Sequence, residues 1–447
     1  MATRSENSGT GETEPALEWF ARWARDRPEA PYLISAAGPV DFAAAHEVIG
    51  GFVGGLQRAF AADSRIGVVM RSDPSHVLLA AAVPLAGMTL IPLPADGPEA
   101  LRRQLAGLAS VVAVADPREL ESARPNFVTP HPSAVHSAVF TSGSTGTPRA
   151  VRLTWANLEA SAASSAEHIG HRPDDRWLAV LPLHHVAGLS ILWRSAREGS
   201  AVVLESGFEV TRVASLLAGG LVTVASFVSP MLERLADSGL DRAPGFRVGL
   251  VGGGPVSGRA LSVGGMLLLP TYGMTETASQ VATADPAHPR IDRLVVLKGA
   301  EISIGTESRI VVDGPMVSSG DLDAPDRSGP LVTGDVGRLH DGLLEVLGRA
   351  DSVIVTGGEN VMPERLERII GALPGVGDVA VVGVPDERWG SVVAVAFTGD
   401  AEPADLEARV RESVARHEIP RQWMRVDVIP MIGIGKIDRR AVAKLFR

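Results

Sequence analysis

A loop rich in glycine and hydroxyl side chains, TSGSTGTPRA at residues 141–150, has the residue types needed to bind a phosphate. The apolar run before it predicts a strand, and the Ala/Ser-rich stretch after Thr154 predicts a helix. A loop between two such elements can direct backbone N–H groups and hydroxyls toward one anion. A flexible linker of this composition fits the flanking elements less well. The loop also differs from the Walker pattern, which ends in Gly-Lys-Ser/Thr.

Six further short motifs contain residues suited to phosphate or carboxylate chemistry. In chain order they are PLHHVAG, GGGP, TYGMTET, TGD, GRADSVIVTGGEN and GIGKIDR. Each also has a purely structural interpretation, because glycines serve tight turns and an Asp before Gly often closes one. The pair His184 and His185 does not indicate a metal site, since no second group of ligands has suitable spacing.

The composition excludes several classes of function. The chain has 447 residues, a net charge of −10 and no cysteine. Without cysteine there are no disulfides, thiolate metal sites or cysteine nucleophile, so any thiol must come from a substrate. The acidic balance argues against a nucleic-acid partner. The polar N-terminus and the lack of long apolar runs favour a cytoplasmic enzyme without membrane insertion, and a homodimer stays open.

Strand-like and helix-like segments alternate up to about Lys298, which indicates mixed or parallel sheets flanked by helices. Ligands of such sheets bind at the carboxyl ends of strands, and GGGP and TYGMTET both follow predicted strands. Short alternating strands after Lys298 predict a β-rich subdomain. We therefore expect an α/β fold with a large domain at 15–350, a small mobile α+β domain at 351–447, and a disordered N-terminus at 1–14.

Taken together, the seven motifs in this order resemble those of the adenylate-forming, AMP-binding superfamily, which includes acyl- and aryl-CoA ligases. The resemblance covers nearly the whole chain after its polar start. It implies activation of a carboxylic acid by ATP with Mg²⁺, followed by thioester formation with coenzyme A. Such chemistry depends on positioning and charge neutralisation rather than on a protein nucleophile.

The resemblance also implies a role for each motif residue. Those around the phosphates and the metal are Thr141, Ser142, Gly143, Ser144, Thr145, Gly146, Arg149, Thr275 and the Mg²⁺ ligand Glu276. Those around the nucleoside are Gly252, Gly253, Gly254, Tyr272, Asp335 and Arg349. The others are the catalytic Lys436, His185 at the acyl pocket, the hinge Asp351, and Gly357 and Gly358 along the CoA path. Arg149-Ala150 replaces the usual Lys-Gly of the superfamily, which keeps the charge but changes its geometry.

Three phrases, LPLHHVAGLSILWRS, TYGMTETASQ and VTGGENVMPERLE, resemble the o-succinylbenzoate–CoA ligase family of menaquinone biosynthesis. An aryl dicarboxylate needs an apolar wall and donors for its distal carboxylate. The pocket candidates are His185, Ser190, Ser226, Gly253 and Ser279. Arg194 ranks lower, because its helix phase predicts that it points outward. The alternatives are a ligase for another aromatic or medium-chain acid, an enzyme that loads a separate carrier protein, or a nucleotide-binding protein without turnover.

Overall fold

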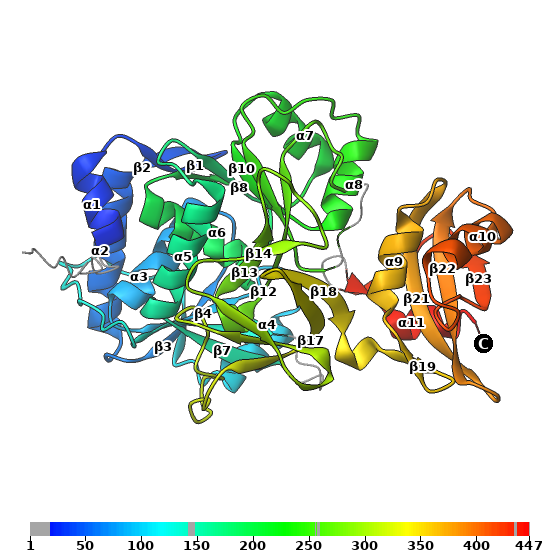
Figure 1. Cartoon of the computed structure of the whole chain (residues 1–447). Coiled ribbons are helices and arrows are strands. Elements are labelled where there is room, and N and C mark those ends of the chain that lie inside the picture. Colours follow the sequence, from blue (N-terminus) through cyan, green and yellow to red (C-terminus); the bar gives the residue numbers. More distant parts are fainter. Residues whose placement is uncertain (1–17, 142–147, 255, 257–259, 433–435, 447) are drawn as a thin grey trace, which may run out of the picture.

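The structure, a computed structural model, describes residues 18–141, 148–254, 256, 260–432 and 436–446. The predicted disordered segment 1–14 lies outside the described residues. A large body holds most of the chain, and a smaller C-terminal part, orange to red in Figure 1, lies at one side of it. The predicted α/β fold class is confirmed.

The first sheet of the large body carries the predicted phosphate loop. Its strands are β3 (Arg65–Val69), β4 (Thr89–Leu93), β5 (Ala113–Ala115), β6 (Val135–Thr141) and β7 (Arg149–Thr154), in the order β5-β3-β4-β6-β7. All neighbours are parallel except β6 and β7. Helices α3 (Pro74–Leu85) and α4 (Glu99–Leu108) pack on it, because its strands are apolar on their buried positions.

The helix predicted after Thr154 is confirmed, but a strand that the sequence analysis did not predict lies between the loop and this helix. Strand β7 follows the loop and pairs antiparallel with β6 from Thr141 and Arg149 onward. The strand forms because Val151 and Leu153 alternate with polar residues and are fully buried. Only then does α5 (Trp155–Ile169) begin, with Thr154 as its N-cap in a capping box. The loop therefore closes a β-hairpin and has no helix N-terminus directly behind it.

The second sheet has thirteen strands and runs through the whole large body. Its parallel strands are β1 (Pro31–Ser35), β8 (Arg176–Ala179), β9 (Ala201–Leu204), β10 (Val224–Phe227), β11 (Val248–Val251) and β12 (Leu268–Met274). Its antiparallel strands are β2 (Gly38–Asp41), β13 (Ser279–Ala284), β14 (Leu294–Val296), β15 (Glu301–Ile304), β16 (Arg309–Asp313), β17 (Leu331–His340) and β18 (Leu343–Arg349). The strand order is β15-β16-β17-β18-β14-β13-β12-β11-β10-β8-β9-β1-β2. The β-rich segment predicted after Lys298 is thus one end of this sheet.

Helices fill the space between and around the two sheets (Figure 1). They are α1 (Glu18–Asp26), α2 (Phe42–Ala59), α6 (Val186–Glu198), α7 (Val210–Ala218) and α8 (Ser229–Asp237), besides α3, α4 and α5. Helix α5 contacts both β7 and β13, so it lies between the sheets and couples them. None of the helices in the described part of the chain is long and apolar enough to cross a membrane.

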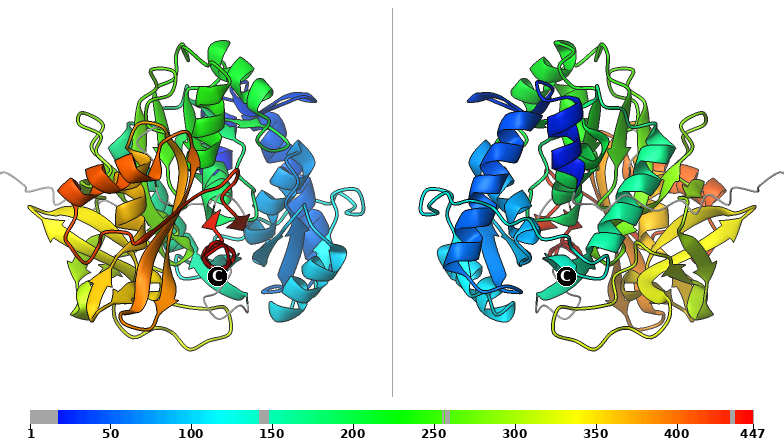
Figure 2. Two further views of the ribbon diagram at one scale, coloured as in Figure 1. Left: turned by 90° about the vertical axis from the view of Figure 1, so that its right-hand side faces the viewer. Right: turned by 90° about the vertical axis from the view of Figure 1, so that its left-hand side faces the viewer.

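The C-terminal part has its own sheet and apolar core. A short 3₁₀ turn at Ala350–Ser352 leads into it from β18. Its elements are β19 (Ile354–Thr356), β20 (Glu359–Val361), α9 (Pro363–Gly371), β21 (Val376–Asp386), β22 (Gly390–Gly399), α10 (Pro403–Ser413), β23 (Gln422–Arg425), β24 (Met431–Ile432), β25 (Lys436–Ile437) and α11 (Arg439–Lys444). Two apolar clusters, both made only of residues after 353, hold it together. Figure 2 shows this part beside the antiparallel end of the large sheet.

Candidate active site

The phosphate hairpin places Arg149 at the exit of the predicted loop. Thr141 ends β6 opposite Arg149, and residues 142–146 of the prediction lie outside the described residues. The Arg149 guanidinium lies between two carboxylates, with Nη2 3.5 Å from Glu276 Oε1 and Nη1 3.5 Å from Asp321 Oδ2. Arg149 is half exposed, so its charge is available to a ligand. The structure therefore brings the predicted phosphate cation to the predicted metal carboxylate.

The carboxylate of Glu276 is held by a tight turn after β12. Thr275–Thr277 forms one 3₁₀ turn, and the Thr277 hydroxyl accepts a bond from the Met274 backbone N–H at 3.0 Å. The Glu276 carbonyl accepts a hydrogen bond of 2.7 Å from the Ser318 N–H. Thr275 and Glu276 are both partly exposed on this turn. The backbone is thereby fixed while both side chains stay accessible to phosphate and cation.

A second cluster joins three residues of the large sheet, on β12, β17 and β18, although β13 and β14 lie between β12 and β18 in the strand order. The Tyr272 hydroxyl donates to Asp335 Oδ2 at 2.9 Å, and Arg349 Nη1 lies 3.5 Å from Asp335 Oδ1. Arg349 also bonds Asp351 at 3.0 Å. Burial raises the pKa of the Asp335 carboxyl, although Tyr272 and Arg349 act in the opposite direction. The predicted adenine, ribose and hinge residues are thus linked in one chain of contacts.

The three glycines after β11, Gly252–Gly254, lie beside the start of the Tyr272 cluster, since Gly252 approaches Thr271. Gly252 bonds the Phe227 carbonyl at 3.2 Å, and a Cβ there would lie 2.9 Å from Thr271 Cγ2. Gly253 has φ +79°, a conformation that other residues rarely adopt. Gly254 is exposed. These positions leave backbone rather than side chains facing the cluster of Tyr272.

Of the serines predicted for the acyl pocket, Ser190 already uses its hydroxyl within its own helix, whereas Ser226 and Ser279 lie on strands of the large sheet. Ser226 at the end of β10 accepts a hydrogen bond of 3.3 Å from Trp177 Nε1, and Ser279 begins β13 at φ +104°. Ser190 is buried, but its hydroxyl donates to the Ala187 carbonyl of its own helix at 2.9 Å. The Ser190 hydroxyl therefore already donates its proton to a carbonyl within α6.

The two histidines stand at the start of α6. Their ring centroids are 4.2 Å apart, and His185 is exposed at the N-cap position while His184 is partly buried. Burial, and to a smaller extent His185, lowers the pKa of His184 to about 4. His184 is therefore a neutral imidazole at neutral pH, and it can donate or accept a hydrogen bond without carrying charge.

The prediction that Arg194 points outward is wrong. Its side chain is 2 % exposed, and Nη1 donates to Gln280 Oε1 at 3.0 Å. The guanidinium also lies 5.8 Å from the Trp177 ring. Nε and Nη2 have no hydrogen-bond partner among the described residues. Helix phase failed here because α6 is buried continuously from Gly188 to Ala196, so that it has no solvent-facing side over this stretch.

Gln280, a residue that the sequence analysis did not name, organises this interior. Its Oε1 accepts bonds from Arg194 and, at 3.3 Å, from Ser165, while its Nε2 donates to Thr283 Oγ1 at 2.9 Å. Gln280 follows Ser279, and Trp177 links Arg194 to Ser226. A buried cation with two nitrogens that lack a partner among the described residues thus contacts Gln280, the neighbour in sequence of the predicted pocket residue Ser279.

In the C-terminal part, the Gly-Gly turn joins β19 to β20. Gly357 and Gly358 have φ +58° and +87°, and a Cβ on Gly357 would lie 2.6 Å from the Trp389 ring. Arg388 and Arg421 lie 5.1 and 4.7 Å from the centroid of that ring. Neither guanidinium has a carboxylate partner in the described ranges. The sequence analysis missed Trp389, although the DERWG phrase contains the only tryptophan of the segment between Gly357 and Ala401.

Lys436 is described only in its backbone, as the first residue of β25. Strand β25 pairs with β24 through Ile432 and Lys436. This hairpin, red in Figure 1, lies on the side of the C-terminal part that faces the large body. Asp351 is exposed in the connecting turn, at the position predicted for a hinge.

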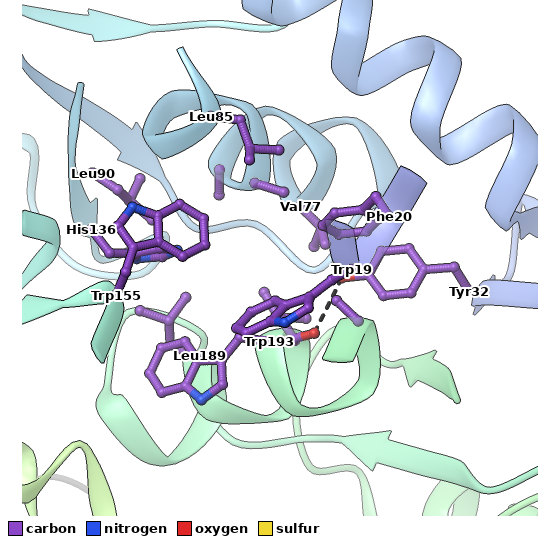
Figure 3. Close-up of a pocket in the computed structure, with 14 residues that line it drawn as sticks. Trp19, Phe20, Tyr32, Val77, Leu85, Leu90, His136, Trp155, Leu189 and Trp193 are labelled. Atoms are coloured by element: carbon purple, nitrogen blue, oxygen red, sulfur yellow. Dashed lines mark hydrogen bonds between the residues drawn. The ribbon is translucent and has the colours of Figure 1, made fainter. Parts of the chain in front are cut away.

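An apolar cavity elsewhere in the large body has none of the predicted site residues in its wall. It lies among α1, α3, α5 and α6, with aromatic side chains such as Trp19, Trp155 and Trp193 around it (Figure 3). His136, also in the wall, is buried and its pKa is lowered to about 3 by that burial. This cavity belongs to the packing of α1 against the body rather than to the clusters described above.

Comparisons with known proteins show the class to which this fold belongs. The family model of the AMP-binding enzyme matches residues 112–320, and that of the AMP-binding enzyme C-terminal domain matches residues 365–436. The chain belongs to the AMP-binding enzyme family. This confirms the resemblance that the seven motifs indicated.

Two curated relatives of this chain share one name, 2-succinylbenzoate–CoA ligase. The chain is 37 % identical over 325 residues to 2-succinylbenzoate–CoA ligase of Listeria monocytogenes, which covers 69 % of each protein. It is 36 % identical over 339 residues to that of Geobacillus kaustophilus, covering 70 % of this chain and 69 % of the relative.

Among solved structures, the fold is similar to o-succinylbenzoate CoA synthetase of Bacillus subtilis in complex with its acyl-adenylate intermediate. The TM-score is 0.83 at 27 % identity, over 96 % of this chain and 98 % of the other. ATP-bound MatB of Rhodopseudomonas palustris has a TM-score of 0.86 at 21 % identity, over 96 % and 99 % of the two chains, and shows the fold alone.

Proposed function

We propose that the protein converts o-succinylbenzoate, ATP and CoA into o-succinylbenzoyl-CoA, AMP and pyrophosphate. In the first step a carboxylate oxygen of the acid attacks the α-phosphorus of ATP and pyrophosphate leaves. In the second step the CoA sulfur attacks the acyl carbonyl carbon, the thiol proton is lost to solvent, and AMP leaves. The 2-succinylbenzoate–CoA ligases at 36 and 37 % identity support this reaction, as does the Bacillus subtilis enzyme that holds the acyl-adenylate.

The buried Arg194 is the observation that favours a dicarboxylate. Burial lowers its pKa to about 9, so it remains a cation at neutral pH. An unpaired charge in the interior costs several kcal/mol, and natural proteins keep one only where a partner compensates it. No carboxylate pairs with Arg194 in the part of the chain that the structure describes. The distal carboxylate of o-succinylbenzoate would supply that partner, directly or through Gln280.

The nucleotide roles follow from the clusters around β12. Tyr272 and the backbone of Gly252–Gly254 would border the adenine, and Asp335 would accept the ribose hydroxyls beside Arg349. Arg149 and the hydroxyls of 141–145 would neutralise and orient the leaving pyrophosphate. Thr275 would contact phosphate at the same turn. This account supports catalysis by positioning and charge rather than by a protein nucleophile.

The residues present fit a magnesium ion that arrives with ATP. Mg²⁺ in nucleotide sites takes one or two carboxylates and completes its shell with phosphate oxygens and water. Glu276 offers one such carboxylate, 18 % exposed, with Arg149 as the neighbouring charge. The described residues contain no group of three or more His, Asp or Glu that would form an all-protein site. The ion would neutralise phosphate charge, and Glu276 would hold it in place.

The C-terminal part would serve both steps by turning about Asp351, as a small domain at 351–447 against a large one at 15–350. Lys436 would stabilise the negative charge of the adenylation transition state. In the second orientation, Gly357 and Gly358 would line the thiol path. The face of Trp389 between Arg388 and Arg421 would then receive the nucleotide end of CoA, since aromatic faces stack on bases and guanidinium groups bind phosphate.

The net charge of −10 supports small-molecule partners over nucleic acid. We place the enzyme in the cytoplasm, where ATP and CoA are present, and leave a homodimer open. His185 would close the acyl pocket at its mouth, with Ser226, Gly253 and Ser279 along its wall and Ser190 behind it.

A pyrophosphate-release assay over a panel of acids, run with and without CoA, tests this function against its alternatives. We expect pyrophosphate with o-succinylbenzoate, and a CoA thioester only when CoA is added. Turnover of a different aromatic or medium-chain acid would point to another ligase. Adenylate that CoA does not discharge would point to a carrier-protein partner, and no pyrophosphate with any acid to binding without turnover.

Arg149→Ala is expected to raise the KM for ATP by about tenfold while changing kcat less, because a phosphate grip made equally in ground and transition states appears mainly in KM. Arg149→Lys keeps the charge but not the planar donor geometry, so it should raise the KM for ATP less than Arg149→Ala does. Steady-state kinetics at varied Mg-ATP measure both. Unchanged ATP dependence in Arg149→Ala would mean that the loop backbone alone binds the phosphates.

A further inference from the structure

One segment of the large body contacts both parts of the phosphate site, and we call residues 318–327 the strap. It lies between β16 and β17 and runs along β7, to which backbone hydrogen bonds and an antiparallel bridge join it. Leu322 N–H donates to the Ala150 carbonyl at 2.7 Å, and Arg152 N–H donates to the Gly320 carbonyl at 3.1 Å. At its start, Ser318 N–H donates to the Glu276 carbonyl. The strap therefore fixes the spacing between the hairpin and the Glu276 turn.

Asp321 occupies a defined place on the strap. It forms an antiparallel bridge with Val151, two residues beyond Arg149 on the same strand face. Diagonal neighbours of this kind are within reach of a long side chain. Asp321 Oδ2 accordingly lies 3.5 Å from Arg149 Nη1, while Arg149 Nη2 faces Glu276. The two ends of one guanidinium are thus shared by two carboxylates.

The other two strap aspartates pair with different arginines of the same sheet. Asp323 binds Arg65 at 2.9 Å, and Asp326 binds Arg152 at 2.5 Å. Neither of these arginines contacts Glu276. Of the three aspartates, only Asp321 has a partner, Arg149, that also contacts Glu276, the proposed Mg²⁺ ligand.

We propose that Asp321 is a positioning residue that holds Arg149 over the phosphate site when Glu276 binds the metal. The proposal rests on the proposed function for the role of Glu276. A cation bound to Glu276 weakens the contact between this carboxylate and the Arg149 guanidinium, since the two positive charges repel. Asp321 would then be the stronger carboxylate partner of Arg149 among the described residues, and it restricts a side chain that is otherwise half exposed.

This arrangement accounts for arginine at a position where the family usually has lysine. A guanidinium presents donors on two sides in one plane, so it can hold a carboxylate at one end and a phosphate at the other. An ammonium group is a point charge on a flexible stem and has no such second end. Asp321 therefore uses a property that Arg149 has and a lysine lacks.

The test measures binding of Mg-ATP to the full chain by isothermal titration calorimetry, without any acid. Asp321→Asn should raise the dissociation constant by about fivefold, the upper range for a partly exposed ion pair. The same change in an Arg149→Ala background should have no further effect, because Asp321 acts only through Arg149. Asp323→Asn, in the same strap but paired with Arg65, is the matched control and should leave Mg-ATP binding unchanged.

Three results would overturn the proposal. One is an unchanged or tighter Mg-ATP affinity in Asp321→Asn, which would make the aspartate neutral or repulsive toward phosphate. Another is an equal loss in the Arg149→Ala background, which would mean direct action on the metal or the fold. The third is an equal loss in Asp323→Asn, which would show that any strap charge matters. Because no acid is present, failure of the proposed substrate would leave this measurement intact, and it would be seen instead as absent pyrophosphate release.

Discussion

Replacing Lys436 by alanine is expected to reduce adenylate formation by about two to three orders of magnitude, while thioester formation from supplied acyl-adenylate stays near the wild-type rate. Removing one preorganised donor aimed at charge that develops in the transition state costs about 3–4 kcal/mol. The effect should be confined to the first step, because in the proposed mechanism the β24–β25 hairpin approaches the α-phosphate only in the adenylation orientation. Pyrophosphate release and single-turnover thioester formation measure the two steps separately.

Lys444→Ala provides the control for Lys436. Lys444 lies on the exposed side of α11, eight positions further along the chain, and should have no effect on either step. Near wild-type adenylation by Lys436→Ala would show that Lys436 is an ordinary surface charge. A loss of both steps would place its role in folding or CoA binding instead.

Arg194→Gln is expected to lower kcat/KM for o-succinylbenzoate by about two orders of magnitude, because truncating one partner of a buried charge pair costs about 2–5 kcal/mol. The same variant should act on the methyl ester of the distal carboxylate nearly as wild type does. The neutral ester presents no charge for the guanidinium to pair with. The ratio of the two kcat/KM values, measured in both proteins, isolates the interaction between Arg194 and the distal carboxylate.

Arg197→Gln is the matched control on the same helix. Arg197 pairs with Glu159 at 2.7 Å and with Glu198, so its charge is already compensated away from the pocket. It should leave the preference for the diacid unchanged. Equal losses for diacid and ester in Arg194→Gln would show that the residue supports packing rather than recognition.

The order of elements could be predicted from the sequence because strongly patterned segments determine it. The apolar run of β11 and the Gly-rich turn after it predict a strand end that is followed by a left-handed residue, Gly253. Strand β7 was missed since it is a short, half-polar segment whose partner, β6, lies across an intervening loop. Strand β7 forms because it pairs with β6, and the hydrophobic pattern of residues 149–154 alone does not predict that pairing.

Some motif residues at strand ends do lie together as the sequence analysis expected, since Tyr272 bonds Asp335 and Arg149 lies beside Glu276. Their roles in the site stay predictions. The site was not predictable where long side chains meet across distant segments. Arg194 finds Gln280 86 residues away, and Arg149 finds Asp321 172 residues away. Such contacts depend on packing of α6 and on the path of the strap, which single-sequence periodicity does not contain.

A competition experiment tests the central claim most directly. The protein is mixed with Mg-ATP, CoA and equal concentrations of o-succinylbenzoate, benzoate and octanoate, and the three CoA thioesters are quantified by mass spectrometry at low conversion. Product ratios then equal ratios of kcat/KM. We expect o-succinylbenzoyl-CoA to exceed each of the others by about a hundredfold or more, since a pocket built for the second carboxylate leaves buried donors unpaired when that group is missing. Predominance of benzoyl-CoA or octanoyl-CoA would contradict the account.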